Sequence, residues 1–193
     1  GGIKKLRGYR GLRTLSEYSD TVILIPNDRL LELTPQIPLV EGFQAIDEFL
    51  IQGVKGIIDL ISNCGLVNLD FADVRGLLTQ RPDKAGFIGM CEISEGESVP
   101  EHVLQALASP LLLPDLEHVD AVLISIAGSQ DLNLRVITEI VETVTRKIAP
   151  EANVKFGATI DPSLGKRLKV TIVGSGPKSP FLIAAEGIKL NDS

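Results

Sequence analysis

Two aspartates and an asparagine form the sharpest candidate site in the sequence. Asn68 is followed by Asp70 and, three residues later, by Asp73. Two carboxylates at this spacing after a turn can polarise one water molecule or hold one cation. The spacing is also close to a capping box, in which an Asp starts a helix and an acid follows three positions on. Because Asp commonly caps helices, the pattern alone favours the structural interpretation.

A second group of candidates lies near the start of a long helical pattern over residues 39–61. It consists of Phe43, Asp47 and Glu48. On pattern alone, we expect Phe43 to belong to the core and the two acids to lie on the solvated face of the helix.

Composition limits the possible classes of function. The chain has 193 residues and a net charge of -6, which disfavours a broad electrostatic contact with nucleic acid or anionic lipid. Cys64 and Cys91 lack a CxxC motif or a Cys/His cluster, so no zinc site is predicted and a reduced, cytoplasmic protein is expected. No apolar run is long enough for a membrane span. Because the chain opens at Gly1 without an initiator Met, we expect it to be part of a longer protein.

The elements that must position these residues are helices interleaved with strands. This order predicts an α/β fold, with a mixed four-stranded sheet covered by helices. Helical spacing is found over residues 3–15, 39–61, 100–108 and 132–148, and apolar runs typical of strands over 21–25, 86–91, 119–126, 154–160 and 168–173.

The helix predicted over 39–61 is long enough to be a spine between two domains, at about 35 Å for a rise of 1.5 Å per residue. Gly53 and Gly56 inside it indicate close packing against a neighbouring element. The strand over 21–25 is expected at the centre of a sheet, because it is apolar throughout. A turn is predicted at 174–176, and 181–185 is a possible edge strand.

Three segments of the chain resemble the FtsZ family, the tubulin-like GTPases of prokaryotic cell division, in order and in spacing. They are VILIPNDRLL at 22–31, GLVNLDFADV at 65–74 and IAGSQDLNL at 126–134. SPLL at 109–112 and LKVTIVG at 168–174 are similar to the family as well. The resemblance covers nearly the whole chain, and its motifs together are highly specific.

The resemblance implies a domain organisation. Residues 1–64 would be the end of a Rossmann-like GTPase domain including the central helix, 65–176 the activation domain with the catalytic loop, and 177–193 a tail. The glycine-rich phosphate loop of the family lies upstream of this chain's first residue, and none occurs here. The chain alone is therefore expected to be inactive and to hold no GTP or GDP tightly, while the full-length protein would bind the nucleotide, with Mg²⁺ as a possible companion.

The resemblance also gives the candidates roles. In the family, the loop containing Asp70 and Asp73 projects from one subunit onto the γ-phosphate bound by the next. Both acids would then orient or activate the attacking water, with Asn68 as a supporting polar contact. Phosphoryl transfer depends mainly on such positioning and electrostatics. The family resemblance thus reverses the preference for a purely structural capping box.

The nucleotide contacts implied by the resemblance lie upstream. Phe43 corresponds to an aromatic that packs against guanine, and Glu48 to the acid that binds the edge of the base. Asp47 stands where the family usually has Asn. Asn27 is a candidate nucleotide contact, and Lys4, with Lys5 beside it, stands nearest the position that lies beside the ribose.

The expected partners are further copies of the same protein in head-to-tail filaments, together with division-ring and membrane-anchor proteins, at the division site in the cytoplasm. No nucleic acid and no direct membrane insertion are expected. Two alternatives remain open from the sequence: a non-hydrolytic FtsZ-like assembly or regulatory module, and a stand-alone α/β enzyme with its site at Asp70 and Asp73. The second alternative ranks last because it lacks a binding motif of its own.

Overall fold

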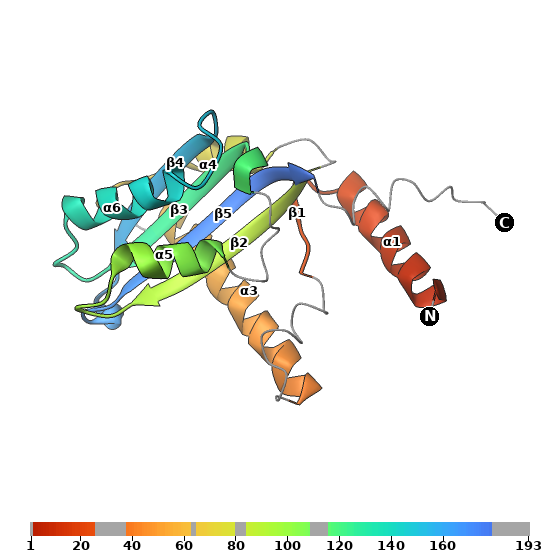
Figure 1. Ribbon diagram of the computed structural model, residues 1–193, viewed down its shortest axis with the longest axis horizontal. Helices are drawn as coiled ribbons and strands as arrows, with labels where there is room; N and C mark the ends of the chain where they lie inside the picture. Colours follow the sequence, from red (N-terminus) through yellow and green to blue (C-terminus); the bar gives the residue numbers. More distant parts are fainter. Residues whose placement is uncertain (1, 26–37, 63–64, 80–83, 109–115, 179–193) are drawn as a thin grey trace.

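The computed structural model describes residues 2–25, 38–62, 65–79, 84–108 and 116–178 (Figure 1). Its elements follow the alternation expected for an α/β protein. In chain order they are α1 (Gly2–Glu17), β1 (Val22–Ile23), α3 (Leu39–Ser62), α4 (Phe71–Leu78), β2 (Lys84–Ile93), α5 (Val99–Leu107), η1 (Leu116–His118), β3 (Ala121–Gly128), α6 (Leu134–Thr145), β4 (Asn153–Ile160), η2 (Pro162–Leu164) and β5 (Leu168–Lys178).

The strands form one mixed five-stranded sheet in the order β1-β2-β5-β3-β4. β5 runs antiparallel to both of its neighbours, β2 and β3, whereas β4 is parallel to β3 and β1 is parallel to β2. The parallel pair β3 and β4 is joined through α6, as a crossover between parallel strands requires. β4 is therefore an outermost strand of the sheet, with one edge free to meet other parts of the chain.

Helices cover the sheet on both faces. α5 and α6 pack on one face, and α3 and α4 on the other (Figure 1). Along β3, Val122 and Ile124 belong to the core with α5 and α6, while Ala121 and Leu123 belong to the core with α3 and α4. A strand buried on both faces is almost wholly apolar, which explains the continuous apolar run of β3.

The long helix α3 approaches the sheet through its glycines. A Cβ on Gly53 would overlap the side chain of Ile88 in β2, and one on Gly56 would lie 2.7 Å from Oγ1 of Thr171 in β5. The Gly56 carbonyl accepts a hydrogen bond of 2.9 Å from the hydroxyl of Ser125 in β3. The close packing predicted for these two glycines is confirmed.

The predicted α/β class, the long helix and the mixed sheet are confirmed, and the structure adds detail that the pattern did not contain. The segment expected as a central strand contributes only β1, at the edge of the described sheet, with Val22 buried and Ile23 half-buried. The turn predicted at 174–176 is wrong, because β5 continues to Lys178. The possible strand at 181–185 lies outside the described residues.

Candidate functional site

The segment between α3 and α4 is fixed to the free edge of β4. Val67 and Ala158 form an isolated antiparallel bridge in which each N–H donates to the other residue's carbonyl, at 3.2 and 3.0 Å. A Cβ on Gly65 would overlap the Ala158 carbonyl oxygen, so only glycine allows this approach. Leu69 packs into the core beneath α3 and α4. The backbone of residues 65–70, hereafter the acid loop, is therefore held in one place.

Asp70 is the N-cap of α4. Its backbone is extended, at φ -82° and ψ 163°, and its Oδ1 accepts a hydrogen bond of 2.6 Å from the N–H of Asp73. This contact is one half of the predicted capping box. The other half, from the Asp70 N–H to the Asp73 carboxylate, is not among the hydrogen bonds of the described residues. Asp70 is nevertheless exposed to solvent, so the cap leaves the carboxylate accessible.

Asp73 makes a contact that the sequence analysis missed. Its Oδ1 lies 3.2 Å from Nζ of Lys155 in β4, and the two side chains are 36% and 41% exposed. Lys155 belongs to none of the three motifs. Its position within an otherwise mostly apolar strand is the feature of the sequence that could have indicated it. Asp70 and Asp73 are thus brought together as predicted, each with one carboxylate oxygen already engaged.

Around the acids the surface is partly apolar. Leu66 and Phe71 are 56% and 63% exposed, one before Asn68 and one directly after Asp70. Asn68 is exposed too, and its Oδ1 accepts a hydrogen bond of 2.6 Å from the N–H of Gly65, which closes the turn. Two large, exposed apolar side chains therefore lie beside the polar groups of the acid loop.

The second group of candidates lies at the other end of α3. Phe43 is 41% exposed, so it is not part of the described core, and Asp47 and Glu48 are exposed as well. From Glu48 to the end of α3 at Ser62 the helix rises by about 21 Å. Figure 1 shows the start of α3 projecting beyond the sheet, whereas α4 lies over it. The structure therefore separates this group from the acid loop.

Two of the predicted nucleotide contacts have no described side chain. Asn27 lies outside the described residues, and Lys4 belongs to α1 but its side chain is not described. Both remain predictions from the resemblance.

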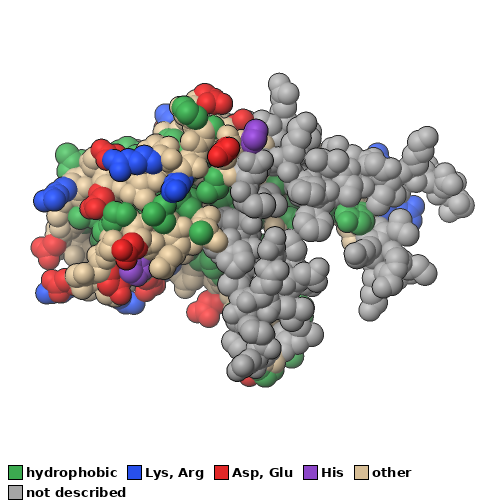
Figure 2. Space-filling model, viewed as in Figure 1, with side chains coloured by type: hydrophobic (Ala, Val, Ile, Leu, Met, Phe, Trp, Pro, Cys, Tyr) green, Lys and Arg blue, Asp and Glu red, His purple; other side chains and the backbone are tan. Residues whose placement is uncertain are grey.

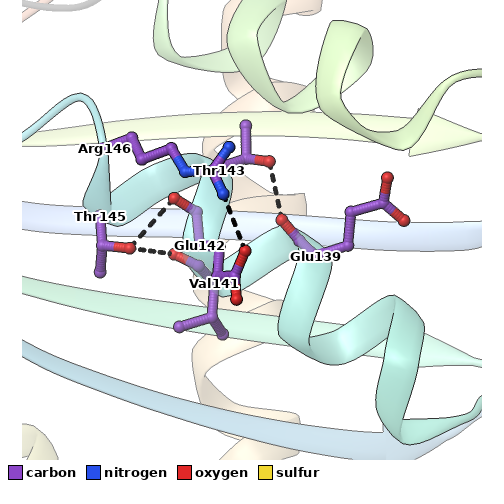
Figure 3. Close-up of polar contacts among 6 residues, drawn as sticks. All are labelled: Glu139, Val141, Glu142, Thr143, Thr145 and Arg146. Carbon is purple, nitrogen blue, oxygen red and sulfur yellow. Dashed lines mark hydrogen bonds and ion pairs between the residues drawn. The ribbon is translucent and has the colours of Figure 1, made fainter.

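Between α3 and the sheet lies a hollow of about 130 Å³, lined largely by polar and charged side chains, among them Lys55, Asp59, Glu92, Asp161 and Lys169. Between α5 and α6 lies a cavity of about 320 Å³. Three of its polar side chains make contacts within α6: Thr143 donates to the Glu139 carbonyl at 2.7 Å, and Arg146 pairs with Glu142 at 3.0 Å (Figure 3). On the same face, acidic and basic side chains are interspersed without a basic patch (Figure 2).

The described cysteine and His102 show no sign of a catalytic role. Burial raises the pKa of the Cys91 thiol to about 12, so this thiol is protonated and unreactive at neutral pH. His102 contacts the Ser98 carbonyl at 3.0 Å and Glu97 at 3.4 Å, near the start of α5.

Within the described ranges, no three or more His, Cys, Asp or Glu side chains are grouped to hold a metal ion. Nor does any described helix combine the length and apolarity of a membrane span.

Comparison with protein families gives a match to the FtsZ family, C-terminal domain, over residues 85–178. The chain is 44% identical over 178 residues to the cell division protein FtsZ of Methanothermobacter thermautotrophicus, which covers 92% of this chain and 46% of that protein. It is 43% identical to the cell division protein FtsZ 1 of Thermococcus kodakarensis, over 96% of this chain and 49% of that protein. The chain thus spans about half the length of the curated relatives it matches.

Solved structures agree with these relatives. An FtsZ dimer from M. jannaschii, described as empty, superimposes with a TM-score of 0.81 at 37% sequence identity, over 91% of this chain and 51% of that one. A CetZ from Methanosaeta thermophila shares the fold, with a TM-score of 0.72 at 20% identity. Both similarities extend well beyond the residues of the acid loop and include the sheet with its helices.

Proposed function

Because this chain belongs to the FtsZ family, we propose that it is the activating part of an assembly-dependent GTPase and supplies the acid loop to the nucleotide of an adjacent subunit. The observation that carries this proposal is the separation of the two candidate groups. The base-binding candidates stand at the start of α3, and the acids follow its end, about 21 Å or more away. Residues so far apart do not serve one nucleotide within one chain, but they suit a head-to-tail stack of copies.

The geometry of the acid loop supports a role in catalysis between subunits. Hydrolysis requires a water molecule to be held in line with the γ-phosphate, and this is mainly a task of positioning. The loop is clamped by the Val67–Ala158 bridge, and both acids remain solvent-accessible. We assign water activation to Asp70 and Asp73 and a supporting polar contact to Asn68. Leu66 and Phe71 would be covered when the neighbouring subunit docks.

The start of α3 fits a guanine base. Phe43 offers a partly exposed aromatic face, and the Glu48 carboxylate can accept from the N1–H and the exocyclic amine of guanine. Asp47 lies one turn beyond Phe43 on the same side of the helix. We assign these three residues to GTP and GDP recognition in the complete protein, where any Mg²⁺ would accompany the phosphates. The proposed setting is the division site, with further copies of the protein in the filament and with division-ring and membrane-anchor proteins as partners.

Complementation between two defective variants tests the proposal directly. One variant of the complete gene product carries Asp70→Ala, and the other has an intact acid loop but cannot bind GTP. Alone, the Asp70→Ala variant should hydrolyse GTP at least about 10²-fold more slowly than the unsubstituted protein, and the second variant should hydrolyse none. A mixture should regain turnover, because the intact loop of one subunit faces the nucleotide of the other. If sedimentation shows co-assembly and the mixture stays inactive, the acids do not act between subunits.

Glu48→Gln in the complete gene product should weaken GTP binding and narrow the preference for GTP over ATP. An amide cannot accept from both guanine donors, and the loss of such a pairing costs about 1–3 kcal/mol. Competition binding with both nucleotides measures the effect. Glu41→Gln is the matched control, since Glu41 is an exposed acid of the same helix that the proposal leaves outside the site. Unchanged affinity and selectivity in Glu48→Gln would remove this residue from the base-binding group.

One observation favours a second candidate, the non-hydrolytic assembly or regulatory module. Asp70 is engaged as the N-cap of α4, which would be sufficient reason for an Asp at this position in a loop that only binds. In that case the exposed Leu66 and Phe71 would still form a contact with another subunit. The two candidates differ in whether the carboxylate is needed once the cap is preserved.

A further inference from the structure

Lys155 is an unusual residue for its place in the fold. It lies in β4, where Val154 and Phe156 on either side pack into the core beneath α5 and α6. By the alternation of a strand, Lys155 points to the opposite face, toward α4. There its Nζ reaches Oδ1 of Asp73 at 3.2 Å.

β4 therefore holds the acid-bearing segment at two points. Its backbone binds Val67 through Ala158, and its side chain at Lys155 binds Asp73. The two contact points are three residues apart along the strand, or about 10 Å. One rigid strand thus fixes both the start of the acid loop and the first turn of α4.

The ion pair between Lys155 and Asp73 also affects the charge of the acid-bearing segment. Asp70 and Asp73 lie three positions apart, and in the proposed function both must approach the phosphates of a neighbouring nucleotide. Like charges repel, and desolvation on docking strengthens the repulsion. The ammonium group of Lys155 offsets one of the two negative charges and restricts the rotamers of Asp73.

We propose that Lys155 is a positioning residue for Asp73, holding its carboxylate in the orientation used for water activation and offsetting its charge as the subunits dock. This inference rests on the proposed function, because it requires that Asp73 acts on the neighbouring nucleotide. Lys155 itself would not touch the reacting atoms.

A double-mutant cycle in filaments of the complete gene product tests the inference. Lys155→Met should lower turnover per bound GTP by about five-fold, as for loss of one partly exposed ion pair, and leave the KM for GTP unchanged. Lys155→Arg should restore turnover, because a guanidinium keeps the ion pair. Adding Lys155→Met to Asp73→Asn should have no further effect. Lys147→Met, which removes an exposed lysine beyond α6, is the matched control.

Each result is decisive. If Asp73→Asn lowers turnover but Lys155→Met does not, or if their effects simply add, Lys155 does not act through Asp73 and the inference is overturned while the proposed function stands. If Asp73→Asn has no effect in confirmed filaments, the role of Asp73 fails and the inference fails with it. If Lys155→Met and Lys155→Arg lower turnover equally and also lower the melting temperature equally, the ion pair is only structural.

Discussion

GTP turnover in filaments of the complete gene product is expected to fall by about 10²-fold or more when Asp70 is replaced by alanine. In the proposed function, the substitution removes a carboxylate that activates water, and general-base contributions are of this size. It also removes the N-cap of α4, which costs about 1 kcal/mol of stability. GTP binding should persist, because the base-binding candidates lie at the other end of α3.

Asp70→Asn separates the two roles of this residue. Asn caps helices as well as Asp does, so the hydrogen bond to the Asp73 N–H is kept while the negative charge is lost. If Asp70 activates water, Asp70→Asn should be nearly as inactive as Asp70→Ala, with a melting temperature close to that of the unsubstituted protein. Steady-state phosphate release from sedimented filaments measures the turnover. Full activity in Asp70→Asn would establish that the cap alone matters.

Gly65→Ala is expected to have a comparably large effect without altering any acid. The new Cβ would overlap the Ala158 carbonyl oxygen, so the acid loop must move away from β4. Forcing a methyl group into such a contact costs about 1–3 kcal/mol, and a displacement of about 1 Å in a catalytic group can lower a rate by about 10²-fold. Turnover should therefore fall far more than GTP binding does.

Gly76→Ala is the matched control for this substitution. Gly76 lies in α4, where a Cβ would meet no other atom within 4 Å. Alanine there should stabilise the helix by about 0.5–1 kcal/mol and leave turnover unchanged. If the loop position matters, the melting temperature should rise in Gly76→Ala and fall in Gly65→Ala, and phosphate release should fall in Gly65→Ala alone. Normal turnover in Gly65→Ala would show that the loop tolerates displacement from β4.

Most of the fold could be predicted from the sequence because the hydrophobic pattern of its helices and strands is strong. The long run of helical spacing predicted α3, and its glycines predicted the close approach to β2 and β5, which the structure confirms. The strand predicted over 21–25 was expected at the centre of the sheet, but β1 lies at its edge. A short apolar run looks the same in sequence whether the strand is central or at an edge. Likewise, glycines at 174 and 176 suggested a turn, yet they lie within β5.

The candidate site was predictable only where it is local in sequence. The cap between Asp70 and Asp73 follows from their spacing, and the structure confirms it. Lys155 is distant along the chain, and its contact with Asp73 depends on where α4 lies on the sheet, over β3 and β5 and beside β4. The pattern did not predict that Phe43 is exposed, because an apolar side chain at helical spacing usually belongs to the core. The domain limits and the nucleotide contacts at Asn27 and Lys4 stay predictions.

The bridge between Val67 and Ala158 also affects whether strands of other molecules can pair with the edge of the sheet. An outermost strand such as β4 presents N–H and C=O groups that can recruit a strand from another molecule and so begin aggregation. Val67 occupies both backbone groups of Ala158, and the charge of Lys155 further discourages strand addition. The contacts that hold the acid loop in place thus also shield part of the exposed sheet edge from pairing with a strand of another molecule.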